Sequence, residues 1–186
     1  MAAIGLYGGA FDPPHNGHVA VAQAAKARFG LPRLVVLVAE APGHKGTHLP
    51  AHARLELAQA AFPDDDVRLD PHARTIDLLR AGEFDDPLLV IGADQFCDFL
   101  EWKEPDAVLE LARLAVATRP GFPRGRLEAV LRELEQPERV VFFDLEPNPA
   151  ASRDVRSLAA AGKPLDGLVP PAVAALIEER RLYRGA

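Results

Sequence analysis

Short runs of uniformly apolar residues recur along this 186-residue chain, and they constrain its fold more than any other feature. Five of these runs are rich in valine, leucine and isoleucine: residues 2–7, 33–39, 87–92, 113–118 and 139–143. A sixth, weaker run covers residues 67–69. Because apolar and polar residues hardly alternate in them, the runs are typical of strands that are buried on both faces of a parallel sheet.

Segments with helical spacing separate the apolar runs. The clearest of them cover residues 16–30, 50–62, 124–136 and 170–183. Strands that alternate with helices indicate βαβ units. The length suits one buried core, and no repeat, low-complexity tract or linker divides the chain. We therefore predict one α/β domain, doubly wound, with a mainly parallel sheet of five to six strands and helices on both faces.

Composition argues against several classes of function. The formal net charge of -6 disfavours a general affinity for the nucleic-acid backbone, although a pocket in an acidic protein can still be locally positive. The single cysteine, Cys97, excludes an internal disulfide and a cysteine-based metal site. No signal peptide is apparent, and no run is as long as a membrane span. We expect a cytoplasmic protein without membrane contact.

The stretch GGAFDPPHNGH, which begins at Gly8, follows the first apolar run. In open parallel sheets, ligands bind beyond the carboxyl ends of the strands, especially where the first strand turns into its helix. Gly8 and Gly9 would let the backbone approach a ligand closely. A helix that starts near Asn16, with Asn16 as the candidate cap, would offer its N-terminus to phosphate. His15 and His18 could then reach the same anion.

Two other interpretations of this stretch are open. The glycines and the Asp-Pro-Pro sequence could build only a tight turn, with a histidine as a helix cap. A zinc site is the second alternative, but no third ligand is evident nearby. His44, His48 and His52 are spaced four apart, yet intervening prolines and glycines break the helical register that a metal site would need. Because the GxGxxG and GxxxxGK[ST] motifs are absent, phosphate would have to bind a turn of another kind.

The same stretch resembles the GGxFDPxHxGH signature of bacterial nicotinate-nucleotide adenylyltransferases, within the HxGH nucleotidyltransferases. Further stretches resemble motifs of this family, in the same order and over nearly the whole chain. They are GHKGTHLPAHARLELAQAAF, RTIDLLR, IGADQFCDFLEWK, ATRPGF and the C-terminal stretch from SRDVR to RRLY. The resemblance implies a single Rossmann-like nucleotidyltransferase domain over residues 1–186.

The implied reaction joins ATP and nicotinate mononucleotide to give the dinucleotide and pyrophosphate. The mononucleotide phosphate would attack the α-phosphorus of ATP, so catalysis would require alignment and charge neutralisation rather than a covalent nucleophile. Mg²⁺ is implied, bound mainly through the ATP phosphates and without a metal site on the protein. Two alternatives are open. One is a related enzyme that uses nicotinamide mononucleotide or phosphopantetheine, and the other is a catalytically silent nucleotide-binding domain.

The resemblance also implies roles for individual residues. The catalytic set is His15, His18, Lys45 and Arg156, with His18 at the α-phosphate. The ATP-binding set is Gly8, Gly9, Ala10, Phe11, His15, His18, Gly92, Asp94, Ser152 and Arg156. The acceptor-binding set is Lys45, Thr75, Asp77, Trp102 and Arg119, with Trp102 stacked on the pyridine ring and Arg119 at the mononucleotide phosphate. Without the resemblance, a lone tryptophan would more often be a core residue, and Lys45 a solvated loop residue.

The chain departs from the family pattern at three places. Ala10 replaces the usual Thr or Ser, Ala73 and Arg74 replace a Ser-Tyr pair, and Ala151 and Arg153 replace hydroxyl residues of the C-terminal motif. These changes remove hydroxyl groups and add cations, which leaves the identity of the acceptor open. The amphipathic helices are compatible with a homo-oligomer, and the sequence does not decide this.

Overall fold

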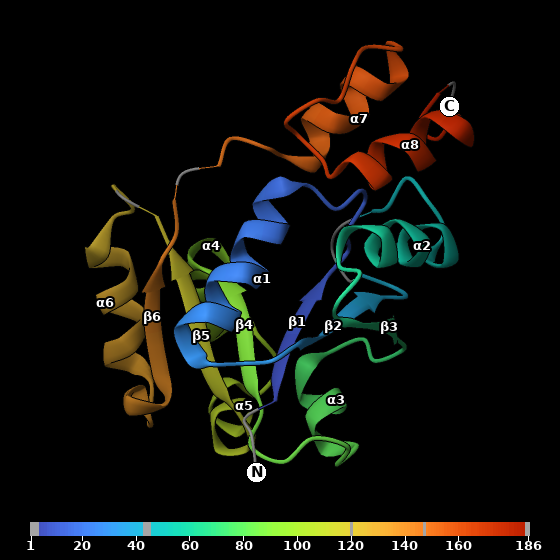
Figure 1. Cartoon of the computed structure of the whole chain (residues 1–186). Helices are drawn as coiled ribbons and strands as arrows, with labels where there is room; N and C mark the ends of the chain where they lie inside the picture. Colours follow the sequence, from blue (N-terminus) through green and yellow to red (C-terminus); the bar gives the residue numbers. More distant parts are fainter. Residues whose placement is uncertain (1–3, 43–45, 120, 147, 185–186) are drawn as a thin grey trace.

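Six parallel strands form the centre of the molecule, in the order β3-β2-β1-β4-β5-β6 (Figure 1). The computed structural model describes residues 4–42, 46–119, 121–146 and 148–184. The strands are β1 (Gly5–Gly9), β2 (Leu34–Ala39), β3 (Asp66–Asp70), β4 (Leu88–Gly92), β5 (Arg113–Thr118) and β6 (Val140–Asp144). All six predicted runs therefore form strands, and the weakest becomes the edge strand β3.

Helices follow most of the strands. They are α1 (Asn16–Phe29), α2 (Ala51–Ala61), α3 (Thr75–Arg80), α4 (Ala93–Cys97), α5 (Pro105–Leu111), α6 (Arg124–Glu133), α7 (Ser152–Ala160) and α8 (Pro171–Glu179). Two short 3-10 turns, η1 (Phe99–Glu101) and η2 (Pro137–Arg139), complete the described part. No helix of that part has both the length and the apolar character needed to cross a membrane.

The sheet separates two apolar cores, because successive strand residues point to opposite faces. Tyr7, Val36 and Val90 belong to the core under α1, α2, α7 and α8. Leu6 and Val35 belong to the core under α3, α4, α5 and α6. Helices thus cover both faces of a parallel sheet, which confirms the predicted fold class.

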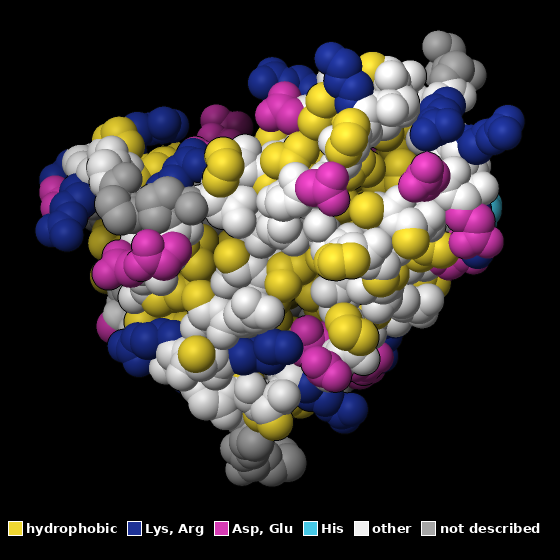
Figure 2. Space-filling model, turned by 45° about the horizontal axis from the view of Figure 1, so that its top comes forward, with side chains coloured by type: hydrophobic (Ala, Val, Ile, Leu, Met, Phe, Trp, Pro, Cys, Tyr) yellow, Lys and Arg dark blue, Asp and Glu magenta, His cyan; other side chains and the backbone are white. Residues whose placement is uncertain are grey.

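The order of the strands reverses between β1 and β4, at the centre of the sheet. From β1 the chain continues to β2 and β3 on one side, whereas β4, β5 and β6 extend on the other. Connections that leave neighbouring strands in opposite directions open a crevice at the carboxyl ends of those strands. Figure 1 shows α7 and α8 beyond this carboxyl edge of the sheet. On the face shown in Figure 2, basic and acidic side chains are dispersed among apolar ones rather than separated by charge.

Candidate active site

The first loop begins later than the sequence predicts. Gly8 and Gly9 pair with Leu37 and Val38 of β2, so they extend β1 rather than opening the loop. A Cβ atom at Gly9 would lie 2.9 Å from the ring of Phe11, whereas one at Gly8 would meet nothing within 4 Å. Gly9 is therefore required for packing beneath the loop, and Gly8 lies open at the edge of the sheet.

Phe11 anchors this loop in the core. Its backbone has a φ of 47°, and its side chain is buried. The ring packs edge-on against Tyr7 and Phe62, with centroid separations of 5.6 Å in each case, and against His18 at 5.1 Å. The side chain thus holds the loop in place, while the backbone around Phe11 stays at the edge where a ligand would bind.

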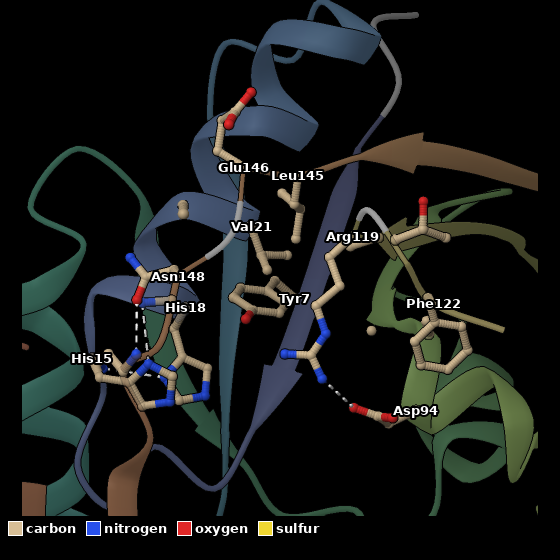
Figure 3. A pocket seen from close by; sticks show the side chains of 17 residues that line it. Tyr7, His15, His18, Val21, Asp94, Arg119, Phe122, Leu145, Glu146 and Asn148 are labelled. Atoms are coloured by element: carbon tan, nitrogen blue, oxygen red, sulfur yellow. Dashed lines mark hydrogen bonds and ion pairs between the residues drawn. The ribbon is translucent and has the colours of Figure 1, made fainter. Parts of the chain in front are cut away.

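His15 and His18 cap helix α1 with their own side chains (Figure 3). His15 Nδ1 accepts a hydrogen bond from the Gly17 backbone N–H at 3.1 Å, and His18 Nδ1 accepts one from the His15 backbone N–H at 3.2 Å. The prediction that Asn16 caps the helix is wrong, because His15 holds the cap position. Asn16 is the first helical residue, and its side chain donates to the Gly167 carbonyl instead.

This arrangement determines the chemistry that the two rings can offer. Burial lowers the pKa of His15 to about 4. Burial, and then the charge of His15, lower the pKa of His18 to about 3. Both rings are therefore neutral near pH 7. Because each Nδ1 accepts a hydrogen bond, the single proton of each ring lies on Nε2. The pair offers two N–H donors to a ligand rather than two positive charges.

Two adjoining cavities lie over this edge of the sheet. The larger is a cleft of about 970 Å³ and the smaller a pocket of about 240 Å³. Tyr7, His18, Gly92 and Asp94 line both of them, so the pocket is a side chamber of the cleft. Figure 3 shows the side chamber from close by.

The cleft brings most of the predicted site residues together. Its lining includes Gly8, Gly9, Ala10, Phe11, His18, Thr75, Gly92, Asp94, Trp102, Ser152 and Arg156. His18, Trp102 and Arg156 therefore share one cleft, as the sequence predicts.

Three predicted site residues are not part of the cleft lining, and a fourth is not described. His15 and Arg119 line the side chamber, where Arg119 Nη2 is 3.8 Å from a carboxylate oxygen of Asp94 (Figure 3). Asp77 lines neither cavity, and its Oδ1 lies 2.9 Å from Lys103 Nζ. Lys45, with His44 before it, lies outside the described residues.

Helix α7 is attached to the first loop by two hydrogen bonds. Ser152 Oγ donates to the Pro13 carbonyl at 2.8 Å, and Arg156 Nη1 donates to the Asp12 carbonyl at 2.6 Å. These bonds bring the C-terminal motif to the cleft. Since only one guanidinium nitrogen of Arg156 has a hydrogen bond within the described residues, the others can serve an anion.

Comparison with known proteins identifies the family of this chain. The family model described as cytidylyltransferase-like matches residues 6–157. The "Probable nicotinate-nucleotide adenylyltransferase" of Symbiobacterium thermophilum is 35% identical, over 98% of this chain and 96% of that protein. The protein of the same name from Thermus thermophilus is also 35% identical, over 97% of this chain and 99% of its own length. The chain belongs to the nicotinate-nucleotide adenylyltransferase family.

Solved structures share the fold. The nicotinic acid mononucleotide adenylyltransferase of Plasmodium falciparum, complexed with APC, matches with a TM-score of 0.76. The match covers 98% of both chains at 16% identity. A second structure of that protein, complexed with NaAD, matches equally well. At this identity the likeness establishes the architecture only.

A buried arginine supports the site in this member of the adenylyltransferase family. Arg54 on α2 is fully buried. Its guanidinium donates to the carbonyls of Ala10 at 2.7 Å, Glu40 at 3.1 Å and Leu49 at 3.1 Å. Burial lowers the pKa of Arg54, and the charge of Asp12 partly offsets this. Arg54 matches an arginine of a family motif, but the sequence alone predicts no role for it.

Asp12 is the functional-site residue that the sequence interpretation missed. Only 6% of its surface is exposed. Its Oδ1 accepts a hydrogen bond from the Tyr183 hydroxyl at 2.8 Å, and its Oδ2 accepts one from the His48 backbone N–H at 2.5 Å. Burial, and then Asp12, raise the pKa of Tyr183. The carboxylate thus connects the first loop with the segment after Lys45 and with the end of the described chain.

Proposed function

We propose that this protein is an enzyme that transfers the adenylyl group of ATP to nicotinate mononucleotide, giving nicotinate adenine dinucleotide and pyrophosphate. One observation carries the proposal. A single cleft is lined by His18 and Arg156 on one side and by the indole of Trp102 on another. The first two suit phosphate, and the indole suits a flat base. Membership of the nicotinate-nucleotide adenylyltransferase family supports the same reaction.

The proposed chemical step needs no covalent group from the protein. An oxygen of the mononucleotide phosphate forms a bond to the α-phosphorus of ATP, while the bond from that phosphorus to the bridging oxygen breaks and pyrophosphate leaves with the electron pair. Charge on the α-phosphate oxygens is stabilised by the Nε2–H donors of His18 and His15. Ser152 and Arg156 hold the β- and γ-phosphates. Lys45, which the structure does not describe, is assigned as a further phosphate contact.

Mg²⁺ enters this proposal as part of the ATP substrate. Within the described residues, no group of three or more His, Cys, Asp or Glu side chains could hold a metal ion. Magnesium commonly keeps several waters and binds through substrate phosphates. Since the imidazoles are neutral, positive charge at the phosphates has to come from arginine, from Lys45 and from the ion that accompanies ATP. We place the reaction in the cytoplasm, where ATP is available.

We assign the acceptor to the part of the cleft beside Trp102. The indole is half-buried and rests on Phe99, with ring centroids 5.2 Å apart. Stacking of a base on such a ring contributes about 1–3 kcal/mol. Thr75 lines the same cleft, and Asp77 supports it through its ion pair with Lys103. Arg119, at the side chamber, is assigned to the mononucleotide phosphate.

The proposal is tested by measuring pyrophosphate release from Mg-ATP with each acceptor in turn. Nicotinate mononucleotide, nicotinamide mononucleotide and phosphopantetheine are supplied separately, and the product is identified by mass. We expect pyrophosphate and nicotinate adenine dinucleotide with the first acceptor. Pyrophosphate release with phosphopantetheine alone would mean that phosphopantetheine, and not a mononucleotide, is the acceptor. No pyrophosphate release with any of the three would identify a catalytically silent domain.

A further inference from the structure

The wall of the cleft that carries Trp102 also carries an arginine without a carboxylate partner. Arg74 lines the cleft, immediately before α3, and its side chain is exposed. Its Nη1 donates to the carbonyl of the preceding residue, Ala73, at 3.2 Å. In the described part of the chain, no Asp or Glu oxygen forms an ion pair with the Arg74 guanidinium.

Two ion pairs fix the position of this arginine relative to the indole. Lys103 Nζ lies 2.9 Å from Asp77 Oδ1, and Arg80 donates to the Glu104 carboxylate through both of its terminal nitrogens. These pairs clamp α3 against the segment that follows η1. Arg74 lies one helical turn before Asp77, and Trp102 immediately precedes Lys103. Arg74 and Trp102, which both line the cleft, are therefore next to residues that this clamp holds together.

The neighbouring charges of this wall are already paired. Asp77 and Lys103 neutralise one another. Asp70, which also lines the cleft, accepts a hydrogen bond from the backbone N–H of His72 at 2.9 Å and lies 2.8 Å from its Nδ1. Among these groups, Arg74 is the cation that remains for a ligand.

The phosphate groups of the substrates belong to a different part of the cleft. The histidine pair begins α1, which lies on one face of the sheet, and Ser152 and Arg156 lie on α7, which is beyond the carboxyl edge and shares the apolar core of that face. Arg74 precedes α3, and Trp102 follows η1, on the opposite face. An acceptor stacked on Trp102 with its phosphate toward α1 would have its ring on the side of the cleft that carries Arg74.

We propose that Arg74 binds the carboxylate of the pyridine ring and thereby selects nicotinate mononucleotide over nicotinamide mononucleotide. This inference rests on the proposed function. A guanidinium offers two parallel N–H donors that match both carboxylate oxygens. The amide of nicotinamide has no charge and presents N–H donors of its own. A charge-assisted hydrogen bond of this kind corresponds to a discrimination of about 10- to 100-fold.

The test compares kcat/KM for the two acceptors at a fixed concentration of Mg-ATP. We expect the Arg74→Gln variant to lose about 10- to 100-fold of the preference for nicotinate mononucleotide, through a higher KM for that acceptor and with the KM for ATP unchanged. Arg74→Lys keeps the charge and should retain part of the preference. Arg153→Gln is the matched control. Arg153 is an exposed arginine that lines the same cleft from α7, and its loss should leave the acceptor ratio unchanged.

Other outcomes would overturn the inference. An equal loss for both acceptors would mean that Arg74 contacts the phosphate they share, and an unchanged ratio would mean that it contacts neither. If the unaltered protein releases no pyrophosphate with either acceptor, the proposed function fails instead. In that case, calorimetric titration with each mononucleotide tests whether Arg74 binds the carboxylate. A binding preference for the nicotinate form that disappears in Arg74→Gln supports the site, and equal binding of both forms contradicts it.

Discussion

His15 and His18 use their two ring nitrogens for separate purposes. The Nδ1 atoms accept backbone hydrogen bonds at the start of α1, which leaves the Nε2–H groups as donors for a phosphate. Sequence reasoning placed both rings at this loop and gave a histidine cap only as the alternative to a ligand role, with Asn16 as the preferred cap. Gly17 was the available signal, because a Cβ atom there would lie 2.9 Å from the His15 ring.

Replacing His18 by glutamate separates its two roles. Glutamate at the third helical position still accepts a hydrogen bond from the backbone of the cap residue, so α1 should remain intact. The ionised carboxylate has no N–H to donate to the α-phosphate, and we expect kcat to fall at least about 100- to 1,000-fold. Turnover is measured by pyrophosphate release, and folding by circular dichroism. His52→Asn alters an exposed histidine of α2 outside both cavities and should keep full turnover. Near-normal turnover of His18→Glu would remove this ring from the mechanism.

Among the secondary-structure elements, the strands were predictable and the helix ends were less so. Burial on both faces removes alternation, and this pattern identified five of the six strands, whereas the half-buried edge strand β3 was indicated only by a short, weaker run. Helix α6 ends three residues before the predicted boundary because Leu134, although buried, has extended backbone. Helix α8 ends at Glu179, and Arg181 and Tyr183 after it have positive φ values. Apolar residues at helical spacing therefore do not require a helix, because they can also be buried from a segment with extended or turn backbone.

The cap of α1 makes the stability of the protein dependent on pH. The pKa values of His15 and His18 are about 4 and about 3 in the folded protein, below the ordinary value of 6.5. Between about pH 3 and pH 6.5, the unfolded chain therefore binds more protons than the folded protein does. The stabilisation is fully present above pH 6.5 and is lost as the pH falls toward 3. Each proton taken up only on unfolding contributes about 1.4 kcal/mol per pH unit.

Urea unfolding at pH 7 and pH 5 checks this expectation. The free energy of unfolding should fall between the two pH values, and it should fall less in a His15→Asn/His18→Gln variant, which keeps capping groups that do not titrate. An equal fall in the variant would assign the pH dependence to other groups.

For the molecule as a whole, the contacts that complete the site join distant parts of the chain. The Tyr183 hydroxyl and the Asp12 carboxylate are separated by 171 positions in the sequence. The hydrophobic pattern predicts an amphipathic helix at the end of the chain, but a single polar contact of this kind depends on the final packing of side chains. The cleft was predictable because its motifs follow strand ends, whereas the Asp12 and Arg54 hydrogen bonds beneath it were not.

Tyr183→Phe tests the contact between the two ends. Removal of the hydroxyl leaves a buried carboxylate oxygen without its donor, and we expect the free energy of unfolding to fall by about 1–3 kcal/mol. Tyr7→Phe is the matched control. Tyr7 is also buried, and its hydroxyl forms no hydrogen bond within the described residues. Urea unfolding at pH 7 measures both variants, and an equal effect of the two would assign the change to packing alone.

The indole that lines the cleft also gives the protein an optical property. Trp102 is the only tryptophan in the sequence, accompanied by two tyrosines, so the long-wavelength fluorescence of the whole molecule originates at this wall. A pyridine ring stacked there would quench that emission, whereas the polyphosphate of ATP, which we propose binds at α1 and α7, would not touch the fluorophore. The protein therefore carries an intrinsic reporter that distinguishes occupancy by one substrate from occupancy by the other.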